Sequence, residues 1–107
     1  MKIPNVIQEL IKAQNTFDSV AYANLFSDTG IVHDEGKTHN GRKEVEQWIA
    51  DANEKYKSIL DPIDYTQKGN KGVLTANVSG TFPGSPIVLK FNFEINDGII
   101  QSLNVTG

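Results

Sequence analysis

The side chains most suited to proton transfer gather in a short polar stretch near the end of the first third of the chain. His33, Asp34 and His39 lie there within seven residues of one another. An imidazole titrates near neutral pH, so either histidine is a candidate acid–base group or metal ligand. Two histidines and one carboxylate also form the ligand set of a facial metal triad, but such triads are assembled on rigid strands. We interpret both histidines first as loop or strand-edge residues, and we predict no metal and no cofactor.

Asp34 has a simple structural interpretation beside the catalytic one. It precedes Glu35 and Gly36, so it can be a solvated aspartate that caps a turn. Adjacent strand residues point to opposite faces, and for that reason we do not expect His33 and Asp34 to contact each other.

Aromatic side chains recur at positions that are predicted to face inward. Such a set can form the wall of a pocket for a flat, mostly apolar ligand, with Trp and Tyr supplying polar tips. The alternative is that each of them is simply part of the core, where aromatic residues are common. The set consists of Tyr22, Phe26, Trp48, Tyr56, Phe91 and Phe93.

The elements that must position these residues are helical in the first half of the chain. Apolar residues at helical spacing predict a first helix over about 4–15, and Asp18 suits the N-cap of a second, shorter helix. Residues 27–30 predict a turn, residues 30–33 a short strand, and residues 34–40 a polar loop. A third helix follows, with acidic residues near its start and basic residues at its end, as the helix dipole favours. Its apolar stripe contains Val45, Trp48, Ile49, Ala52 and Tyr56.

After Lys57 the period of the apolar residues changes from 3.6 to 2, which indicates strands. The first strand is the weakest, because Pro62 restricts it to an edge or a bend. The next two alternate strongly between apolar and polar residues, as strands with one buried face do. Helices followed by an antiparallel sheet define the α+β class. The predicted strands cover residues 59–68, 73–82, 87–96 and about 99–105.

Two segments resemble a known family. They read FSDTGIVHDEG from Phe26 to Gly36 and HNGRKEVEQWI from His39 to Ile49. Both are similar to a pattern of nuclear transport factor 2-like and SnoaL-like proteins, and the order of elements agrees over nearly the whole chain. The resemblance implies a cystatin-like α+β roll, in which a cone-shaped, curved antiparallel sheet wraps around three N-terminal helices and leaves an apolar cavity. The family contains ketosteroid isomerases, polyketide cyclases, dehydratases, epoxide hydrolases and non-catalytic domains, so the fold does not decide the chemistry.

The resemblance also implies a role for Asp34. This residue falls where ketosteroid isomerases keep their general-base aspartate, whose pKa an apolar cavity raises toward that of the proton it moves. The dienolate-stabilising donors of those enzymes are missing, because Leu10 and Phe91 occupy their positions. Loss of one such donor lowers the rate about 10²- to 10³-fold, so we do not expect ketosteroid isomerase activity. The Asp–Arg–Asp set of the epoxide hydrolases has no match either, since the sole arginine, Arg42, begins a helix.

A catalytic Asp34 would therefore need a different hydrogen-bond donor. The strong side-chain donors of the helical half are few, and we expect at least one of them to approach Asp34. They are Tyr22, His33, His39, Trp48 and Tyr56.

Composition excludes several classes of function. The chain has no cysteine, which rules out disulfides and thiolate metal sites and fits a reducing cytoplasm. The net charge of −3 is spread evenly, without the basic surface that nucleic acids require. No apolar run approaches the roughly 18 residues of a membrane span, and no signal-peptide pattern follows the start. We therefore expect one cytoplasmic domain, 1–107, with neither nucleic acid nor membrane as a partner.

Three hypotheses about function stay open. The one we rank first is a domain whose apolar pocket binds a small hydrophobic or aromatic molecule. The second is a SnoaL-like isomerase, cyclase or dehydratase that uses Asp34 as general acid–base, assisted by His33 or His39. The third is a non-catalytic oligomerisation module whose cavity is filled by its own side chains. The resemblance and the polar faces of the long strands also predict a homodimer joined through the outer face of the sheet.

Overall fold

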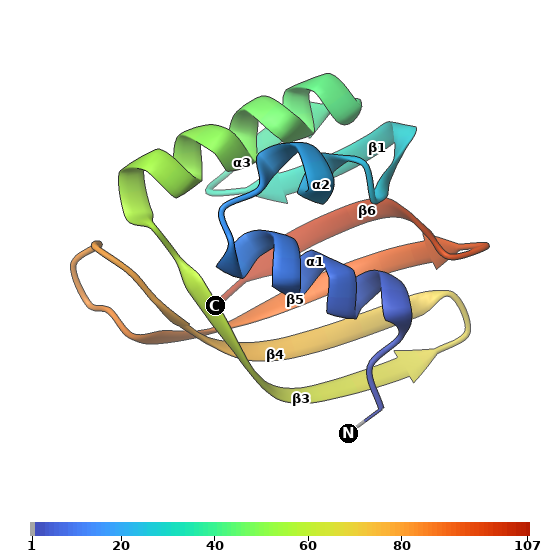
Figure 1. Ribbon diagram of the computed structural model, residues 1–107. Helices are drawn as coiled ribbons and strands as arrows, with labels where there is room; N and C mark the ends of the chain where they lie inside the picture. Colours follow the sequence, from blue (N-terminus) through green and yellow to red (C-terminus); the bar gives the residue numbers. More distant parts are fainter. Residues whose placement is uncertain (1) are drawn as a thin grey trace.

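Helices cover one face of a curved sheet (Figure 1). The computed structural model describes residues 2–107, and within this range it contains three helices and six strands. This arrangement confirms the α+β class and the cystatin-like roll. In chain order the elements are α1 (Asn5–Asn15), α2 (Ser19–Ala23), β1 (Phe26–Asp34), β2 (Lys37–Asn40), α3 (Arg42–Tyr56), β3 (Ile59–Lys68), β4 (Lys71–Ser79), β5 (Ile87–Asn96) and β6 (Ile99–Thr106).

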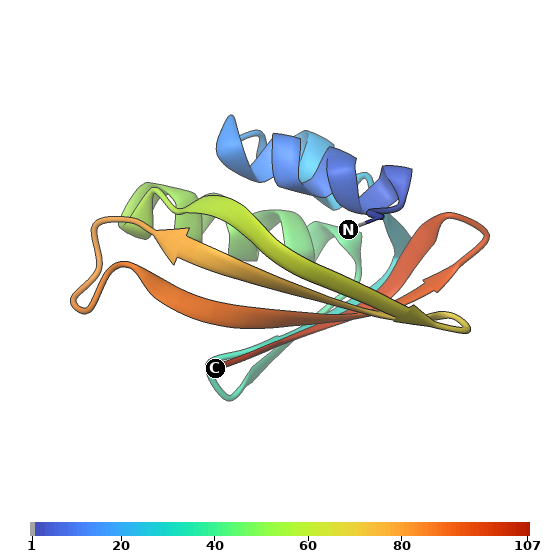
Figure 2. The same cartoon turned by 90° about the horizontal axis from the view of Figure 1, so that it is seen from below.

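The six strands form one sheet in the order β2-β1-β6-β5-β4-β3. Strands β3 to β6 are a meander of antiparallel neighbours, and β1 pairs with β2 in the same antiparallel sense. Only β1 and β6 run parallel among the strand pairs of residues 2–107, and this pairing joins the two halves of the sheet. Figure 2 shows α1 and α2 on one side of the twisted strands. None of the helices in the described residues is long and apolar enough to span a membrane.

Both N-terminal helices begin close to the predicted positions. α1 buries Ile7, Leu10 and Ala13, which recur at helical spacing. Asp18 caps α2, because its carboxylate accepts a hydrogen bond of 3.0 Å from the backbone N–H of Ala21. The side chain of Ala21 is exposed. α2 is barely more than one turn long and buries its last residues.

The segment between α2 and α3 differs from the expectation. Residues 27–30 do not form a separate turn but lie inside β1, where the register against β6 shifts between Phe26 and Ile31. Residues 34–40 are not a loop, because β2 folds back on β1 as a hairpin. The two turn residues, Glu35 and Gly36, have φ angles of 52° and 74°, as a tight hairpin turn requires. Strand β2 has no apolar alternation that could have identified it.

The C-terminal meander follows the prediction except at the second strand, where β4 begins at Lys71 and ends at Ser79 and residues 80–82 lie outside it. β3 is an edge strand, and its pairing with β4 is irregular between Pro62 and Asp64, as a proline within a strand requires. Asp97 and Gly98 form the hairpin turn before β6, both at positive φ. The outer face of the sheet carries polar side chains such as Asn92, and a homodimer through this face stays a prediction.

Candidate functional site

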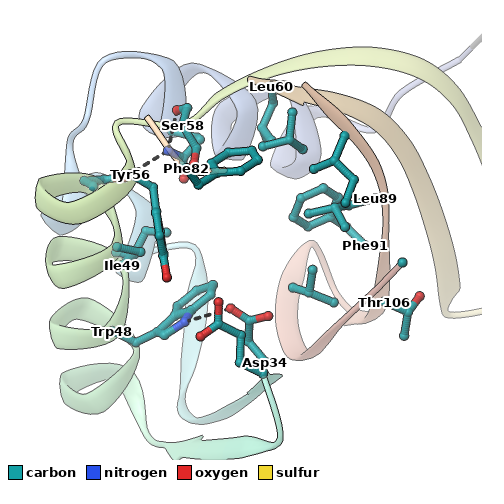
Figure 3. Close-up of a pocket in the computed structure, with 18 of the residues that line it drawn as sticks. Asp34, Trp48, Ile49, Tyr56, Ser58, Leu60, Phe82, Leu89, Phe91 and Thr106 are labelled. Atoms are coloured by element: carbon teal, nitrogen blue, oxygen red, sulfur yellow. Dashed lines mark hydrogen bonds between the residues drawn. The ribbon is translucent and has the colours of Figure 1, made fainter. Parts of the chain in front are cut away.

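A cavity of about 440 Å³ lies between α3 and one end of the sheet. Its walls come from α3, the ends of β1, β4 and β6, the beginnings of β3 and β5, the segment after β4, and one residue each of α1 and α2. Figure 3 shows apolar side chains around much of its circumference, with polar groups at Asp34, at Ser58 and at Thr106. The apolar wall includes Ile49, Leu60, Val78, Phe82, Leu89 and Phe91.

The predicted aromatic set divides between this cavity and the core. Four of its members line the cavity: Tyr22, Trp48, Tyr56 and Phe91. The other two do not. Phe26 is 0% exposed and its ring stacks on that of Tyr22, with centroids 5.9 Å apart. Phe93 is 3% exposed and lies farther along β5, so both residues belong to the core.

Asp34 ends β1, and its half-buried carboxylate lines the cavity. The indole N–H of Trp48 donates a hydrogen bond of 3.3 Å to its Oδ2 atom (Figure 3). Burial raises the pKa of Asp34 above the ordinary 3.8, and the charge of Glu35 raises it further. Three weaker effects oppose the rise in pKa: the bond from Trp48, the backbone N–H of Glu35, and the nearby His39. Trp48 is thus a donor that approaches Asp34, as the sequence led us to expect.

Tyr22 brings a second polar group to the same part of the cavity. Its side chain is 2% exposed, and its ring centroid lies 6.1 Å from that of Trp48. Burial raises the pKa of the Tyr22 phenol, and the negative charge of Asp34 raises it further. The phenol therefore keeps its proton at neutral pH and can donate a hydrogen bond to a ligand.

The two candidate histidines lie outside the cavity lining. His33 is exposed, and its Nδ1 lies 3.1 Å from Oγ1 of Thr38 on the opposite strand of the hairpin. The ring of His39 is half-buried beside Trp48, with centroids 5.8 Å apart. His39 therefore packs against the indole that binds Asp34, and its electrostatic effect lowers the pKa of Asp34. Within residues 2–107, no three His, Cys, Asp or Glu side chains come together as a metal-binding group.

Solved structures with the same architecture identify the family. The protein SMa1630 of Sinorhizobium meliloti, proposed to be a polyketide cyclase, is 32% identical over 97% of this chain and 95% of its own, with a TM-score of 0.93. The chain belongs to the nuclear transport factor 2-like (SnoaL-like) superfamily.

Two further solved structures are similar in fold. A protein of Catenulispora acidiphila with a ketosteroid isomerase-like fold is 18% identical, over 99% of this chain and 87% of its own, with a TM-score of 0.89. The epoxide hydrolase/cyclase-like enzyme SalBIII, which has a role in pyran ring formation in the polyether salinomycin, is 20% identical. That match covers 94% of this chain and 85% of SalBIII, with a TM-score of 0.74. No family model and no curated protein sequence matches the chain.

The nuclear transport factor 2-like cavity of this protein contains a pair of amides that sequence reasoning missed. Gln14 of α1 and Asn53 of α3 both line it, and they are 4% and 8% exposed. Nε2 of Gln14 donates to Oδ1 of Asn53 at 2.9 Å and to the backbone carbonyl of Ser58 at 2.8 Å. The signal was present in the sequence. Gln14 follows Leu10 by four residues on the inward stripe of α1, as Asn53 follows Ile49 on α3.

Arg42 connects α3 to β1, the two elements that carry Trp48 and Asp34. It is the first residue of α3, and its guanidinium pairs with Asp28 at 2.8 Å. It also donates to the backbone carbonyl of Phe26, with its NH2 group at 2.8 Å. Asp28 and Phe26 lie in the irregular part of β1. Arg42 therefore ties the start of α3 to the strand that ends at Asp34.

Proposed function

We propose that the protein binds a small, mainly apolar or aromatic molecule in the cavity between α3 and the sheet. The observation that supports this best is the cavity itself, about 440 Å³ with mostly apolar walls and few polar groups. Small-molecule sites have this size and composition. The unfilled volume favours a binding domain over a module whose cavity is filled by its own side chains.

Blocking the cavity tests this proposal. Ala52 lines it and lies on α3 one turn after Trp48, so the Ala52→Phe side chain should occupy the space of a ligand. We expect 2-acetonaphthone, a rigid aromatic ketone, to bind the wild type saturably in isothermal titration calorimetry. Ala52→Phe should weaken this binding at least about tenfold, which corresponds to about 1.4 kcal/mol.

The matched control is Gln47→Phe. It places the same side chain on an exposed position of the same helix, outside the cavity lining, and should leave binding unchanged. Trp48 is the sole tryptophan, so quenching of its fluorescence reports occupancy independently. A wild type that does not bind the ketone, or binding that Ala52→Phe does not weaken, would contradict the proposal.

A second candidate function is acid–base catalysis by Asp34, and the raised pKa of this carboxyl beside the Trp48 indole favours it. When ionised, Asp34 can remove a proton from the carbon next to a ligand carbonyl. The negative charge that then develops on the carbonyl oxygen can accept a hydrogen bond from Tyr22. Return of the proton from Asp34 to another position completes an isomerisation, as expected of a SnoaL-like isomerase, cyclase or dehydratase. The proposed cyclase activity of SMa1630 belongs to the same class of chemistry.

Hydrogen–deuterium exchange tests this candidate separately from binding. In D2O the acetyl protons of 2-acetonaphthone should exchange faster with the protein present, and ¹H NMR measures the rate. Asp34→Asn should lower the acceleration about 10²-fold or more, because it removes the base. The acceleration should rise with pH through the raised pKa of Asp34, since only the carboxylate accepts a proton.

His33→Asn is the control for this exchange experiment. His33 neighbours Asp34 in the sequence but lies outside the cavity lining, so its variant should exchange protons like the wild type. Exchange that Asp34→Asn does not slow would remove the catalytic candidate and leave the binding proposal intact.

A further inference from the structure

The hydrogen bonds of Gln14 fix the orientation of the amide pair. The backbone carbonyl of Ser58 can only accept, so the Gln14 atom 2.8 Å from it must be the Nε2 donor. The same Nε2 donates to Asn53, so the Asn53 atom in that contact must be the Oδ1 acceptor. This leaves one acceptor, Oε1 of Gln14, and one donor, Nδ2 of Asn53, for other partners.

These two remaining atoms are open to the cavity. Among the described residues, the only side-chain oxygen or nitrogen that is both fully buried and without a partner is the hydroxyl of Ser27. Neither Oε1 of Gln14 nor Nδ2 of Asn53 takes part in a hydrogen bond within residues 2–107, so both atoms retain accessible surface. Both residues are more than nine-tenths buried and line the cavity, and we therefore assign that surface to the space inside it.

The amide pair and Asp34 lie at different ends of the cavity. Asn53 follows Trp48 by five residues on α3, which corresponds to about 7.5 Å along the helix axis. Figure 3 shows Ser58, which accepts the bond from Gln14, across the open space from Asp34. The wall between the two ends includes apolar side chains, such as Ile49 on α3 and Phe91 on β5.

We propose that Gln14 and Asn53 form a second ligand-binding pole, which selects a hydroxyl group at the end of the ligand remote from Asp34. This inference rests on the proposed function of the cavity and specifies the ligand class. The ligand is a mainly apolar carbonyl compound with a hydroxyl at its far end. A hydroxyl matches the pair because it donates one hydrogen bond, to Oε1 of Gln14, and accepts another, from Nδ2 of Asn53.

The charges around the cavity favour a neutral ligand group over a negatively charged one at the amide pair. The two carboxylate side chains in the lining, Asp34 and Glu35, are adjacent at the opposite end, and no Lys, Arg or His of the described chain lines the cavity. A carboxylate or phosphate at the amide pole would therefore have no positive partner. Burying such an unpaired charge is costly.

Ligands that differ in one group test the proposal. The probes are 2-acetonaphthone and its 6-hydroxy and 6-methyl derivatives, in which the second substituent lies at the end of a rigid frame opposite the ketone. Hydroxyl and methyl are nearly equal in size, so their comparison isolates hydrogen bonding. By calorimetry the hydroxy compound should bind the wild type about tenfold more tightly than the methyl compound.

Substitutions in the amide pair test whether this pair causes the preference for the hydroxy compound. Asn53→Leu keeps the volume but removes the donor, and the ratio of the two affinities should fall to about one. If Asn53→Leu does not fold, Gln14→Met tests the acceptor half of the pair with the same two ligands. Tyr56→Phe is the control, because it removes one hydroxyl from the cavity lining, leaves both amides in place and should preserve the ratio.

The outcomes separate this inference from the proposed function. Equal affinities of the hydroxy and methyl compounds for the wild type overturn the second pole, while binding of 2-acetonaphthone still supports the cavity as a ligand site. A preference for the hydroxy compound that persists in Asn53→Leu, or that disappears in Tyr56→Phe, also overturns the second pole. If none of the three compounds binds, both the second pole and the proposed function fail.

Discussion

The helix-facing side of the sheet is filled at one end and open at the other, although the same strands form both. On β4 and β5, Leu74 and Phe93 are 0% and 3% exposed and pack into the core. A few residues away on β5, Leu89 is half-buried and lines the cavity, and Ile87 at its rim is 44% exposed. The alternation of apolar residues is equally regular at both ends.

The difference teaches that a strand pattern predicts which way a side chain points but not what lies opposite it. At the filled end the strands meet apolar residues of the N-terminal helices, such as Ile7 and Leu10. At the open end they face α3, whose inward side there carries Ala52, a small residue, and the amide of Asn53. Small and polar side chains of α3 thus border the space that the strands leave open, beside the larger Trp48, Ile49 and Tyr56 of the same helix.

The largest effect should come from truncating a side chain at the filled end. Leu74→Ala should lower the free energy of unfolding by about 2–5 kcal/mol, because it creates a new void in a closely packed region. Urea denaturation followed by circular dichroism measures this. A loss below about 1 kcal/mol would mean that this end is not tightly packed, and the comparison would fail.

The same substitution at the open end should have a smaller effect. Leu89 already borders an unfilled space, so Leu89→Ala enlarges an existing cavity and removes fewer contacts. We expect a loss of about 1 kcal/mol in the same denaturation experiment. Equal losses for Leu74→Ala and Leu89→Ala would show that the two ends are packed alike, with the cavity collapsed in solution.

The smallest expected effect is that of Asp34→Asn, which should raise rather than lower the free energy of unfolding at pH 7. Because the folded-state pKa of Asp34 is raised above 3.8, the folded protein holds this proton more tightly than the unfolded chain does. The stability that Asp34 contributes is thus present at low pH and decreases as the pH rises through the window above 3.8. Asp34→Asn should stabilise the protein slightly at pH 7 and lose this advantage below pH 3.8. Greater stabilisation at low pH than at pH 7 would show that the Asp34 carboxyl is not buried as described.

Local signals predicted much of this fold, and they failed where the structure depends on distant contacts. Pro62 identified an edge strand and Asp18 a helix start, since each acts through its own backbone or its near neighbours. The hairpin at 34–40 was missed because β2 is polar and is held by pairing with β1.

The sequence predicted the candidate site about as well as it predicted the fold. Asp34 was found through the resemblance, and its place at the cavity and its bond to Trp48 agree with the expectation. Phe26 and Phe93 could not be separated from the cavity-lining aromatics, because core and pocket residues share the same inward faces. Gln14 and Asn53 were overlooked, although polar residues on apolar stripes mark buried hydrogen bonds.

Each polar end of the cavity has one member on α3. Trp48 and Asn53 both belong to this helix, and the spacing between them is set by the helical rise. Their partners Asp34 and Gln14 belong to β1 and α1, so a movement of α3 away from the sheet would stretch the Trp48–Asp34 and the Gln14–Asn53 hydrogen bonds together. The helix thus couples the two polar ends mechanically.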